Sequence, residues 1–490
     1  MNKPSKYQKA IYEFLATGSG NAIVQAVAGS GKTTTILNCA KLIPENSMSI
    51  FVAFNKSIAT ELNDKLPKNV QARTLHSLGY SMFFANTNSK VKLDNDKLEN
   101  IIKLVLKENQ IEEYDTMYSV MFRQIKIIVP LLKAFNSNYK DFKEVEDVIV
   151  YKNIECNLDS IFHLIGEVMD KCKKQISTID FDDMVWIPVV NNFTTKTYDF
   201  VFVDEVQDLN KIQFELIKKL CNGNTRIIAV GDRQQSIYAF RGADTNSMDN
   251  FKEYFKAVEM PLSISYRCSK NVVELAKTIV PEIEVFDKAI DGEVDAISFD
   301  NIISKAEDED MVLCRTNAPL IKVVFAFIRN NKKAIIRGTD IAKKIVKRVN
   351  QYKVSSLEEL HIKILRYKEL QSEKLLLIEK GEYDKRKKNH LLTEIDICDT
   401  ILVVSENVGN IDELKSKVLE IFSDDREGIV CSSVHKAKGL EADNVFILNY
   451  NLMPHPMAET EDELQQEMNI KYVAITRAKK NLFYCIDELR

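Results

Sequence analysis

The chain has 490 residues, more than one hydrophobic core usually supports, so its length predicts two or more domains. Hydrophobic residues make up 45% and charged residues 28% of the sequence, a balance typical of a soluble, globular protein. The net charge of −4 excludes a globally basic surface, so any nucleic-acid site has to be a local groove.

The cellular compartment is indicated by what the sequence lacks. No stretch approaches about 18 consecutive apolar residues, and the first residues have neither a hydrophobic signal core nor a transit-peptide composition. The nine cysteines include no C-x-x-C pair and no spacing suited to zinc, so we expect buried, reduced thiols. These features predict a cytoplasmic protein.

Short apolar runs recur along the chain and predict strands that are buried on both faces of parallel sheets. These runs are Ile23–Val27, Ile50–Phe54, Phe200–Val203, Arg226–Val230, Met311–Cys314, Ala334–Ile336, Ile429–Cys431, Val445–Leu448 and Leu482–Ile486. Two long stretches between them, roughly 85–177 and 341–424, contain few Gly or Pro residues and predict helices. The pattern predicts an α/β fold with two cores of parallel sheet flanked by helices, each with a mainly helical insertion.

The expected domain boundaries follow from this alternation. We expect the first core over 1–85 and 178–260, with its helical insertion over 86–177. We expect the second core over 261–340 and 425–490, with a short helical insertion over 341–424. Within the latter, the charges of Lys363–His390 favour a solvated helix face over a contact with a phosphate backbone.

The segment Ala28–Thr33 reads A-G-S-G-K-T, follows the first apolar run and precedes a predicted helix over Thr34–Leu42. This order is typical of a P-loop, in which backbone N–H groups surround phosphates, Lys32 reaches the β and γ oxygens, and Thr33 holds Mg²⁺. The first glycine of the usual pattern is replaced by Ala26. A simple glycine-rich turn is the weaker alternative, because strand, loop and helix occur in the expected order.

Two carboxylates, Asp204 and Glu205, directly follow the apolar run Tyr198–Val203. The carboxyl end of a sheet strand is where α/β proteins bind ligands. There Asp204 can hold the metal through water, and Glu205 can activate the attacking water. Together with the P-loop, this pair predicts hydrolysis of a nucleoside triphosphate.

Further motifs occur in a characteristic order along nearly the whole chain. They are Gln8; Phe54-Asn55-Lys56; Thr74-Leu75-His76; Asp180-Phe181-Asp182-Asp183-Met184; Asp204-Glu205-Val206-Gln207-Asp208; the run from Val230 to Ala243; Ser265-Tyr266-Arg267; the run from Val434 to Glu441; and Tyr472 to Ala478. The sequence closely resembles the UvrD/Rep-type superfamily 1A DNA helicases. The F-N-K-S-I-A and D-F-D-D-M segments are most similar to the F-box DNA helicase branch and its small bacterial and phage relatives, and we expect the motor without an F-box.

The resemblance implies two RecA-like cores that hydrolyse ATP between them, with Mg²⁺. The implied catalytic residues are Lys32, Glu205, the γ-phosphate sensor Gln235, and the arginine fingers Arg267 and Arg477. The implied nucleotide contacts are Gln8 at the adenine edge, Ala28, Gly29, Ser30, Gly31, Lys32, Thr33, Thr34, Tyr266 stacked on the base, Gly439 and Glu441. The implied metal-holding residues are Thr33 and Asp204.

The resemblance also implies a groove for single-stranded DNA, lined by Phe54, Asn55, Thr74, His76, Tyr238, Phe240, Arg241 and His435. Aromatic rings stack on bases of any sequence, which suits a motor and explains how an acidic protein holds DNA. Alternatives remain for single residues: Phe54 and Phe240 as core residues, and the two histidines as interior ones. The only tryptophan, Trp186, is expected to pack in the core.

The implied function is an ATP-dependent, 3′ to 5′ DNA translocase and helicase acting in replication, recombination or repair on single strands and duplex junctions. Two positions depart from the family pattern: Glu467–Lys471 lacks the usual arginine, and Ser433 replaces a threonine. The insertion over 341–424 is also short.

Two rival hypotheses are a nucleic-acid clamp that uses ATP only as a switch, and a P-loop kinase. No carboxylate cluster in the sequence suggests an attached nuclease.

Overall fold

The computed structural model describes residues 3–87, 91–111, 116–152, 154, 156–237, 246–380, 388–406, 408–423, 427–456 and 458–485. It divides into two compact units: Met1–Val27 with Gly31–Ser263, and Ala28–Ser30 with Ile264–Arg490. Each unit contains its own cluster of buried apolar side chains. The finer division into cores and insertions stays a prediction.

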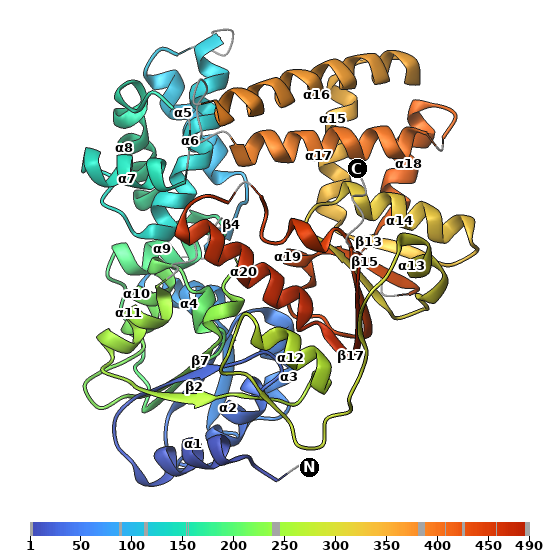
Figure 1. The fold of residues 1–490 in the computed structure, drawn as a ribbon. Helices are drawn as coiled ribbons and strands as arrows, with labels where there is room; N and C mark the ends of the chain where they lie inside the picture. The colour runs from blue at the N-terminus through green and yellow to red at the C-terminus, as the bar shows by residue number, and fades with distance from the viewer. Residues whose placement is uncertain are drawn as a thin grey trace. The chain divides into compact units, whose positions relative to one another are not determined.

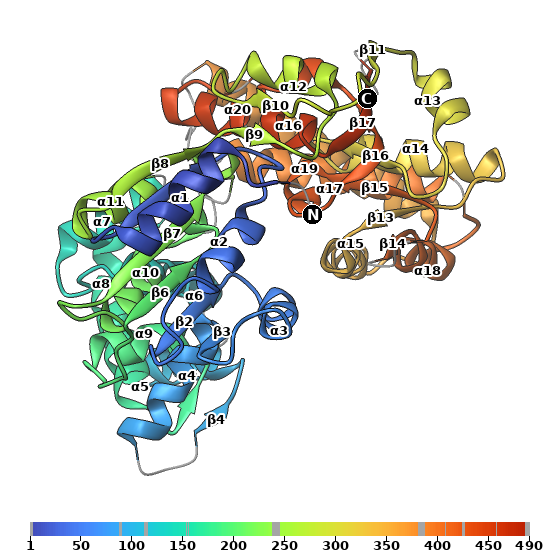
Figure 2. The same ribbon diagram turned by 90° about the horizontal axis from the view of Figure 1, so that it is seen from below.

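The first unit is built on a six-stranded sheet in which every pair of neighbours is parallel (Figure 2). Its strands, in the order β3-β2-β6-β7-β1-β8, are β1 (Ala22–Ala26), β2 (Ser49–Ala53), β3 (Val70–Thr74), β6 (Phe200–Val203), β7 (Arg226–Gly231) and β8 (Val258–Leu262). Alternate side chains of one strand face opposite sides, so Ile23 packs in one apolar cluster and Val24 in the other. Helices therefore cover both faces.

The helices of this core follow the strands and bury one apolar stripe each. They are α1 (Lys6–Thr17), α2 (Lys32–Ala40) and α3 (Lys56–Asn63) on one face, and α4 (Leu75–Asn86), α9 (Asp183–Val190), α10 (Lys211–Lys219) and α11 (Ser247–Tyr254) on the other. Trp186 in α9 is 1% exposed and belongs to the core, which confirms its expected packing role.

The two outer strands of this sheet, β3 and β8, are absent from the apolar runs of the sequence. Gln71 is exposed on β3, and β8 carries Glu259 and Pro261. A strand at a sheet edge pairs on one side only, so it tolerates polar side chains and proline. Edge position thus explains why periodicity alone missed both strands.

Between α4 and α9 the chain forms a helical subdomain, seen as the cyan-to-green helices in Figure 1. It contains α5 (Lys97–Glu108), α6 (Thr116–Phe135), α7 (Phe142–Tyr151), α8 (Leu158–Lys174) and the short paired strands β4 (Lys92–Leu93) and β5 (Thr178–Ile179). The buried faces of α5, α6 and α8 belong to the same apolar cluster as α4 and α9. The predicted helical stretch is therefore helical over most of its described residues.

The second unit contains a seven-stranded parallel sheet in the order β11-β17-β16-β12-β15-β13-β14. Its strands are β11 (Val294–Ala296), β12 (Met311–Cys314), β13 (Ala334–Arg337), β14 (Phe422–Ser423), β15 (Ile429–Ser433), β16 (Ala442–Ile447) and β17 (Ala478–Tyr484), and β9 (Ile264–Ser265) pairs with β10 (Glu284–Val285). The associated helices are α12 (Lys270–Lys277), α13 (Phe299–Lys305), α14 (Ala318–Arg329), α19 (Val434–Ala437) and α20 (Glu461–Ile475).

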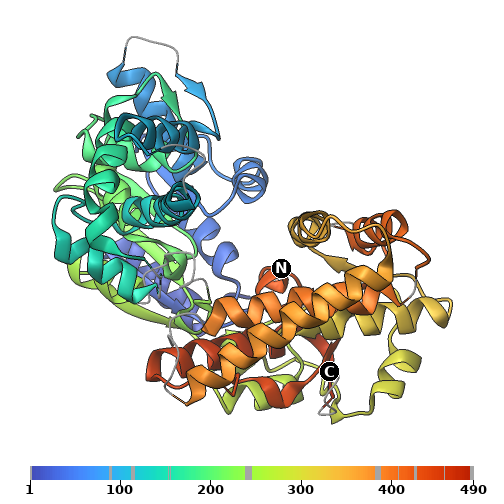
Figure 3. The same ribbon diagram turned by 90° about the horizontal axis from the view of Figure 1, so that it is seen from above.

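The second helical stretch comprises α15 (Thr339–Gln351), α16 (Leu357–Glu379), α17 (Lys388–Ser405) and α18 (Ile411–Ile421). Helices α16 and α17 lie side by side (Figures 1 and 3). Lys363 pairs with Glu359 on the same helix, and Lys368 pairs with Asp399 of α17. These charges of α16 are thus satisfied by neighbouring side chains.

Both parallel sheets, with helices packed against them, confirm the predicted α/β class. The nine predicted strands are present, with ends that differ by a few residues. All nine cysteines are free thiols, seven of them buried. None of the helices in the described residues is long and apolar enough to cross a membrane.

Candidate nucleotide and nucleic-acid site

The P-loop connects β1 to α2 at the carboxyl edge of the first sheet. Gly31 has φ +82°, a left-handed conformation that glycine adopts without steric cost, and it forms the N-cap of α2. The turn at Gly31 lets the helix begin at Lys32, two residues earlier than expected. The hydroxyl of Ser30 is buried and has no hydrogen-bond partner among the described residues. Buried polar atoms normally have a partner, so this oxygen is available to a ligand.

The two predicted carboxylates lie next to the P-loop. Asp204 follows β6, and its Oδ2 accepts a hydrogen bond of 3.2 Å from Oγ1 of Thr33. The Lys32 Nζ lies 3.4 Å from Oε2 of Glu205. Glu205 has φ +52°, which is uncommon for a residue with a side chain and costs of order 1 kcal/mol or more. The first unit thus assembles these four predicted residues at one edge of the sheet.

Burial makes the charge of Asp204 unfavourable in the structure as it stands. The pKa of Asp204 is raised to about 7, first by burial and then by repulsion from Glu205, while Lys32 opposes the rise. A carboxylate held in this way gains from a nearby cation. The residues described include no group of three or more His, Cys, Asp or Glu side chains that could hold a metal ion.

A chain of hydrogen bonds connects Glu205 to the predicted phosphate sensor Gln235. Gln207 donates from Nε2 to Oε2 of Glu205 at 2.5 Å, and its Oε1 accepts from the Asp232 N–H at 3.0 Å. Gln235 donates to Oδ2 of Asp232 at 2.6 Å. Burial raises the pKa of Asp232 to about 6. The sequence motifs contain Gln207 and Asp232 but do not predict a role for them; the structure places both between Glu205 and Gln235.

Gln8 lies in the first turn of α1, where it forms a capping box with Ser5. Its Nε2 donates to Oγ1 of Thr35 at 3.1 Å, so its amide faces the start of α2. The group expected to read an adenine edge is therefore adjacent to the P-loop helix.

The predicted residues of the second unit are also grouped. Arg267 Nε lies 2.6 Å from Oε2 of Glu441, and Arg267 Nη1 donates to the Thr476 carbonyl at 3.3 Å. Arg477 is 1% exposed and donates to the carbonyl oxygens of Val473 at 2.9 Å and Leu440 at 3.2 Å. Burial and the neighbouring Arg267 lower the pKa of Arg477 to about 10.

Residues 28–30 belong to the second unit and contact two of its aromatic residues. The Ala28 N–H donates to Oη of Tyr472 at 2.9 Å, and the Tyr266 N–H donates to the Gly29 carbonyl at 2.9 Å. The ring of Tyr266 lies 4.9 Å from that of Phe286. Tyr472 belongs to the Y-V-A motif, and the sequence predicts no role for its hydroxyl. Gly439, with φ +86°, and the half-buried His435 of α19 complete the predicted set in this unit.

Four predicted DNA contacts follow the adjacent strands β2 and β3. Phe54 is 49% exposed, so the core alternative for this ring is wrong. Asn55 caps α3 by accepting from the Ile58 N–H at 2.9 Å, and Thr74 caps α4 by accepting from the Ser77 N–H at 3.2 Å. His76 lies in the first turn of α4 and is not part of a metal cluster among the described residues.

Sequence reasoning missed the aromatic partner of His76. The ring of Phe181 stacks on the imidazole with centroids 3.9 Å apart and an interplanar angle of 22°, although Phe181 is 55% exposed. Burial lowers the pKa of His76 to about 4, so its ring is neutral near pH 7. The signal in the sequence that could have predicted this stack is the phenylalanine of the D-F-D-D-M motif, an apolar residue among acidic ones.

Comparison with known proteins identifies the family. Residues 7–256 match the UvrD/REP helicase N-terminal domain, and residues 428–484 match the UvrD-like helicase C-terminal domain. The first match alone covers half of the chain. The chain belongs to the UvrD/REP helicase family.

Relatives of this helicase-family chain are distant in sequence. F-box DNA helicase protein 1 of Schizosaccharomyces pombe is 25% identical over 522 residues, covering 97% of this chain and 56% of the relative. The probable DNA helicase II homolog of Mycoplasma pneumoniae is 28% identical over 54% of this chain and 41% of its own. ATP-dependent DNA helicase PcrA of Staphylococcus epidermidis is 23% identical over 96% of this chain and 82% of its own. The chain spans about half the length of the first of these curated relatives.

The structure of an arterivirus helicase, nonstructural protein 10, aligns over 95% of this chain and 59% of its own, with 10% identity and a TM-score of 0.36. At that TM-score the alignment adds nothing to the assignment of the fold. The fold class stands on the two parallel sheets themselves.

The predicted DNA contacts Tyr238, Phe240 and Arg241 lie outside the described residues.

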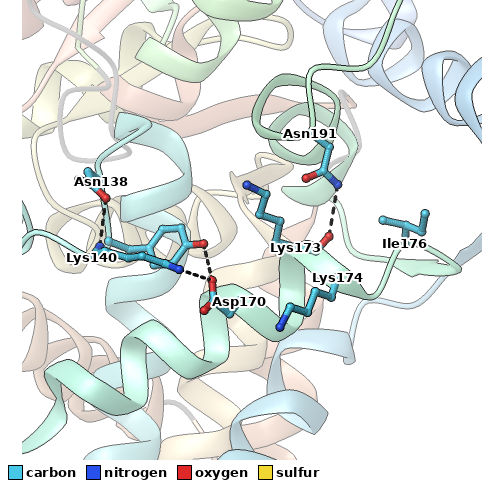
Figure 4. A pocket seen from close by; sticks show the side chains of 8 residues that line it. Asn138, Lys140, Asp170, Lys173, Lys174, Ile176 and Asn191 are labelled. Carbon is cyan, nitrogen blue, oxygen red and sulfur yellow. Dashed lines mark hydrogen bonds and ion pairs between the residues drawn. The ribbon is translucent and has the colours of Figure 1, made fainter.

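A cavity of about 620 Å³ lies in the helical subdomain and is lined by Asn138, Tyr139, Lys140, Asp170, Lys173, Lys174, Ile176 and Asn191 (Figure 4). None of these residues belongs to a helicase motif. Asp170 accepts from Tyr139 Oη at 2.7 Å and lies 3.3 Å from Lys140 Nζ, so this carboxylate is satisfied within the cavity wall.

Proposed function

We propose that this chain is an ATP-dependent single-stranded DNA translocase and DNA helicase that moves 3′ to 5′. One observation carries the proposal. Lys32 pairs with Glu205 and Thr33 bonds to the adjacent Asp204, in a chain of the UvrD/REP helicase family. We propose its substrates to be single-stranded DNA and duplex junctions in replication, recombination or repair, and the domain boundaries to be those predicted above.

The oxygen ligands of Thr33 and Asp204 fit Mg²⁺, which commonly binds one or two protein oxygens together with substrate phosphates. When bound there, the ion would neutralise charge on the transferring phosphoryl group. Burial raises the pKa of Asp204, and a cation bound beside it would favour the ionised form of this carboxylate. The P-loop residues, including Ala28, Gly29, Ser30, Gly31 and Thr34, would surround the phosphates.

Hydrolysis needs a base next to the attacking water. Glu205 is the proposed base, and its carboxylate is oriented by Lys32 and Gln207. Gln235 would sense the γ-phosphate and is joined to Glu205 through Asp232 and Gln207. This connection supports a sensor that acts on the same phosphate as the base.

Gln8 would contact adenine and Tyr266 would stack on it, while Gly439 and Glu441 would approach the phosphates and ribose. Arg267 and Arg477 would stabilise the charge of the transferring phosphoryl group, as a planar, always-charged guanidinium does. Their common connection to Thr476 supports a joint role.

Single-stranded DNA would be held chiefly by stacking. The exposed ring of Phe54 and the Phe181–His76 stack offer apolar faces to bases of any sequence. Asn55 and Thr74 cap helices whose first N–H groups suit phosphate oxygens. We propose that His435, Tyr238, Phe240 and Arg241 complete the groove.

A strand-displacement assay tests the proposal with a labelled duplex that carries a 3′ tail, a 5′ tail or none. With ATP and Mg²⁺, we expect displacement of the 3′-tailed substrate only, together with ATP hydrolysis stimulated by single strands. DNA-stimulated hydrolysis without displacement of any substrate would instead support a clamp that uses ATP as a switch. ATP hydrolysis that DNA does not stimulate would contradict both the helicase and the clamp.

A further inference from the structure

Four charged side chains are buried where the helical subdomain meets the core of the first unit. Lys97 of α5 lies 2.5 Å from Oδ2 of Asp183, and Lys133 of α6 lies 2.8 Å from Oδ1 of the same residue. Lys133 also lies 3.3 Å from Oδ2 of Asp180. The side chains of both lysines are 1% exposed. The two positive charges of Lys97 and Lys133 thus face the two negative charges of Asp180 and Asp183 in a site that is largely closed to water.

The lysines complete this network with further partners. Lys97 donates to the carbonyl oxygens of Cys172 at 3.1 Å and Gln175 at 2.8 Å, at the end of α8. Lys133 lies 5.5 Å from the centre of the Trp186 ring. Because Asp183 contacts both lysines and also bonds to Asp180, the network holds the start of α9 in one position.

Asp180 and Asp183 enclose the residue that stacks on His76. The Asp183 N–H donates to Oδ1 of Asp180 at 2.7 Å, which closes a tight turn around Phe181. On its other side, α4 approaches so closely that a Cβ at Gly79 would lie 1.9 Å from the Met184 carbonyl oxygen. The turn is therefore held between α4, which carries His76, and the two lysines.

We propose that Lys97 and Lys133 are positioning residues for DNA binding: they hold the Asp180–Asp183 turn so that Phe181 stays stacked on His76 and exposed to a base. The inference rests on the proposed DNA groove. Desolvation offsets most of the attraction within a buried ion network, so we assign this network a role in orientation and not in net stability. The lysines of the helical subdomain would thereby influence the affinity of the core for single-stranded DNA.

The first measurement is affinity for a fluorescent oligothymidylate, determined at low temperature with the full chain. Lys133→Met should raise Kd by about 5- to 150-fold, the range expected for the loss of one stacked base. Phe181→Ala should produce a similar rise. In the Phe181→Ala background, Lys133→Met should change Kd by less than about twofold, because both changes remove the same interaction.

Two further variants separate positioning from general stability. Lys126 lies on the same helix α6, is partly exposed and pairs with Glu99 of α5. Lys126→Met should leave Kd unchanged. Lys133→Met combined with Asp180→Asn removes both charges of one pair and keeps an oxygen acceptor for the Asp183 N–H. It should fold even if Lys133→Met alone does not, and it should still raise Kd.

A readout without DNA tests the positioning directly. The imidazole of His76, followed by NMR, should titrate near pH 4 in the wild type and closer to pH 6.5 in the double variant, because the stack has loosened. An unchanged His76 titration would overturn the inference, as would equal effects of Lys133→Met with and without Phe181. If His76 responds as expected but Phe181→Ala leaves Kd unchanged, the positioning holds and the proposed groove is wrong.

Discussion

At the scale of single residues, burial decides which charges are available for chemistry. Asp204 is nearly inaccessible, and its carboxylate lies beside both Thr33 and the Glu205 backbone. The positive charge of Lys32 lies beside the neighbouring carboxylate, Glu205. The charges around the P-loop are thus held in place by protein groups, which reduces the reorganisation needed for phosphoryl transfer.

Lys32→Ala should abolish ATP hydrolysis while the melting temperature stays near that of the wild type. The lysine pairs with Glu205 and does not belong to the apolar core, and its proposed ligand is a phosphate of the nucleotide. ATPase rates and thermal melting on one preparation check this. Lys41→Ala is the matched control, because Lys41 is exposed at the other end of α2 and should keep full activity. Wild-type rates in Lys32→Ala would refute the site assignment.

Arg477→Ala should leave nucleotide affinity within a modest factor and lower kcat by about 10³-fold, because an arginine finger acts on transition-state charge. The melting temperature should fall as well, since the carbonyl groups of Val473 and Leu440 lose a buried donor. Nucleotide titration and steady-state kinetics separate the two roles. Lost affinity with unchanged kcat would indicate a ground-state binding role instead.

The pH dependence of stability should contain a contribution from His76. Its pKa is about 4 in the folded protein and 6.5 when unperturbed, so only the unfolded chain gains a proton between these values. The stabilising contribution is complete above pH 6.5 and is lost progressively as the pH falls towards 4. The urea midpoint of the wild type should therefore fall relative to that of His76→Phe as the pH is lowered through this range. Parallel midpoint curves would contradict the lowered pKa.

At the scale of elements, close packing of α4 against α9 sets the position of the His76 and Phe181 rings. His76 lies in the first turn of α4, Phe181 lies just before α9 begins at Asp183, and the two helices meet at Gly79. The polar residues Asn55 and Thr74 serve as helix caps whether or not they also contact DNA. Local capping and a binding role are compatible, because a cap leaves other N–H groups of the first turn unbonded.

Gly79→Ala should destabilise the protein by about 1–3 kcal/mol, because the new methyl group meets backbone atoms that cannot rotate away. Single-strand affinity should fall as α4 shifts from α9. Gly166→Ala in α8 is the control: nothing lies within 4 Å of its added Cβ. That variant should gain about 0.5–1 kcal/mol from helix propensity. Chemical denaturation of both variants tests the contrast.

At the scale of the whole molecule, two units with separate apolar cores need not unfold together. We expect calorimetry to give a total enthalpy larger than the van 't Hoff value. A non-hydrolysable ATP analogue with Mg²⁺ at about 100 times Kd should stabilise the P-loop-containing fold by ~2.7 kcal/mol in the wild type. It should have little effect in Lys32→Ala, and an equal shift in both proteins would contradict nucleotide binding at the P-loop.

Apolar runs and local motifs predict the strands at the centres of both sheets, the P-loop and the Asp204–Glu205 pair, because these features depend on residues that are close together in the chain. The apolar pattern does not predict the edge strands β3 and β8, because they carry polar residues that are tolerated only at a sheet edge. The stack of Phe181 on His76 is seen only in the folded chain, and so are the contacts of Lys97 and Lys133 with Asp183, which lies 86 and 50 residues away in sequence. Such pairings depend on how helices pack against one another, and no local pattern of residues specifies that packing.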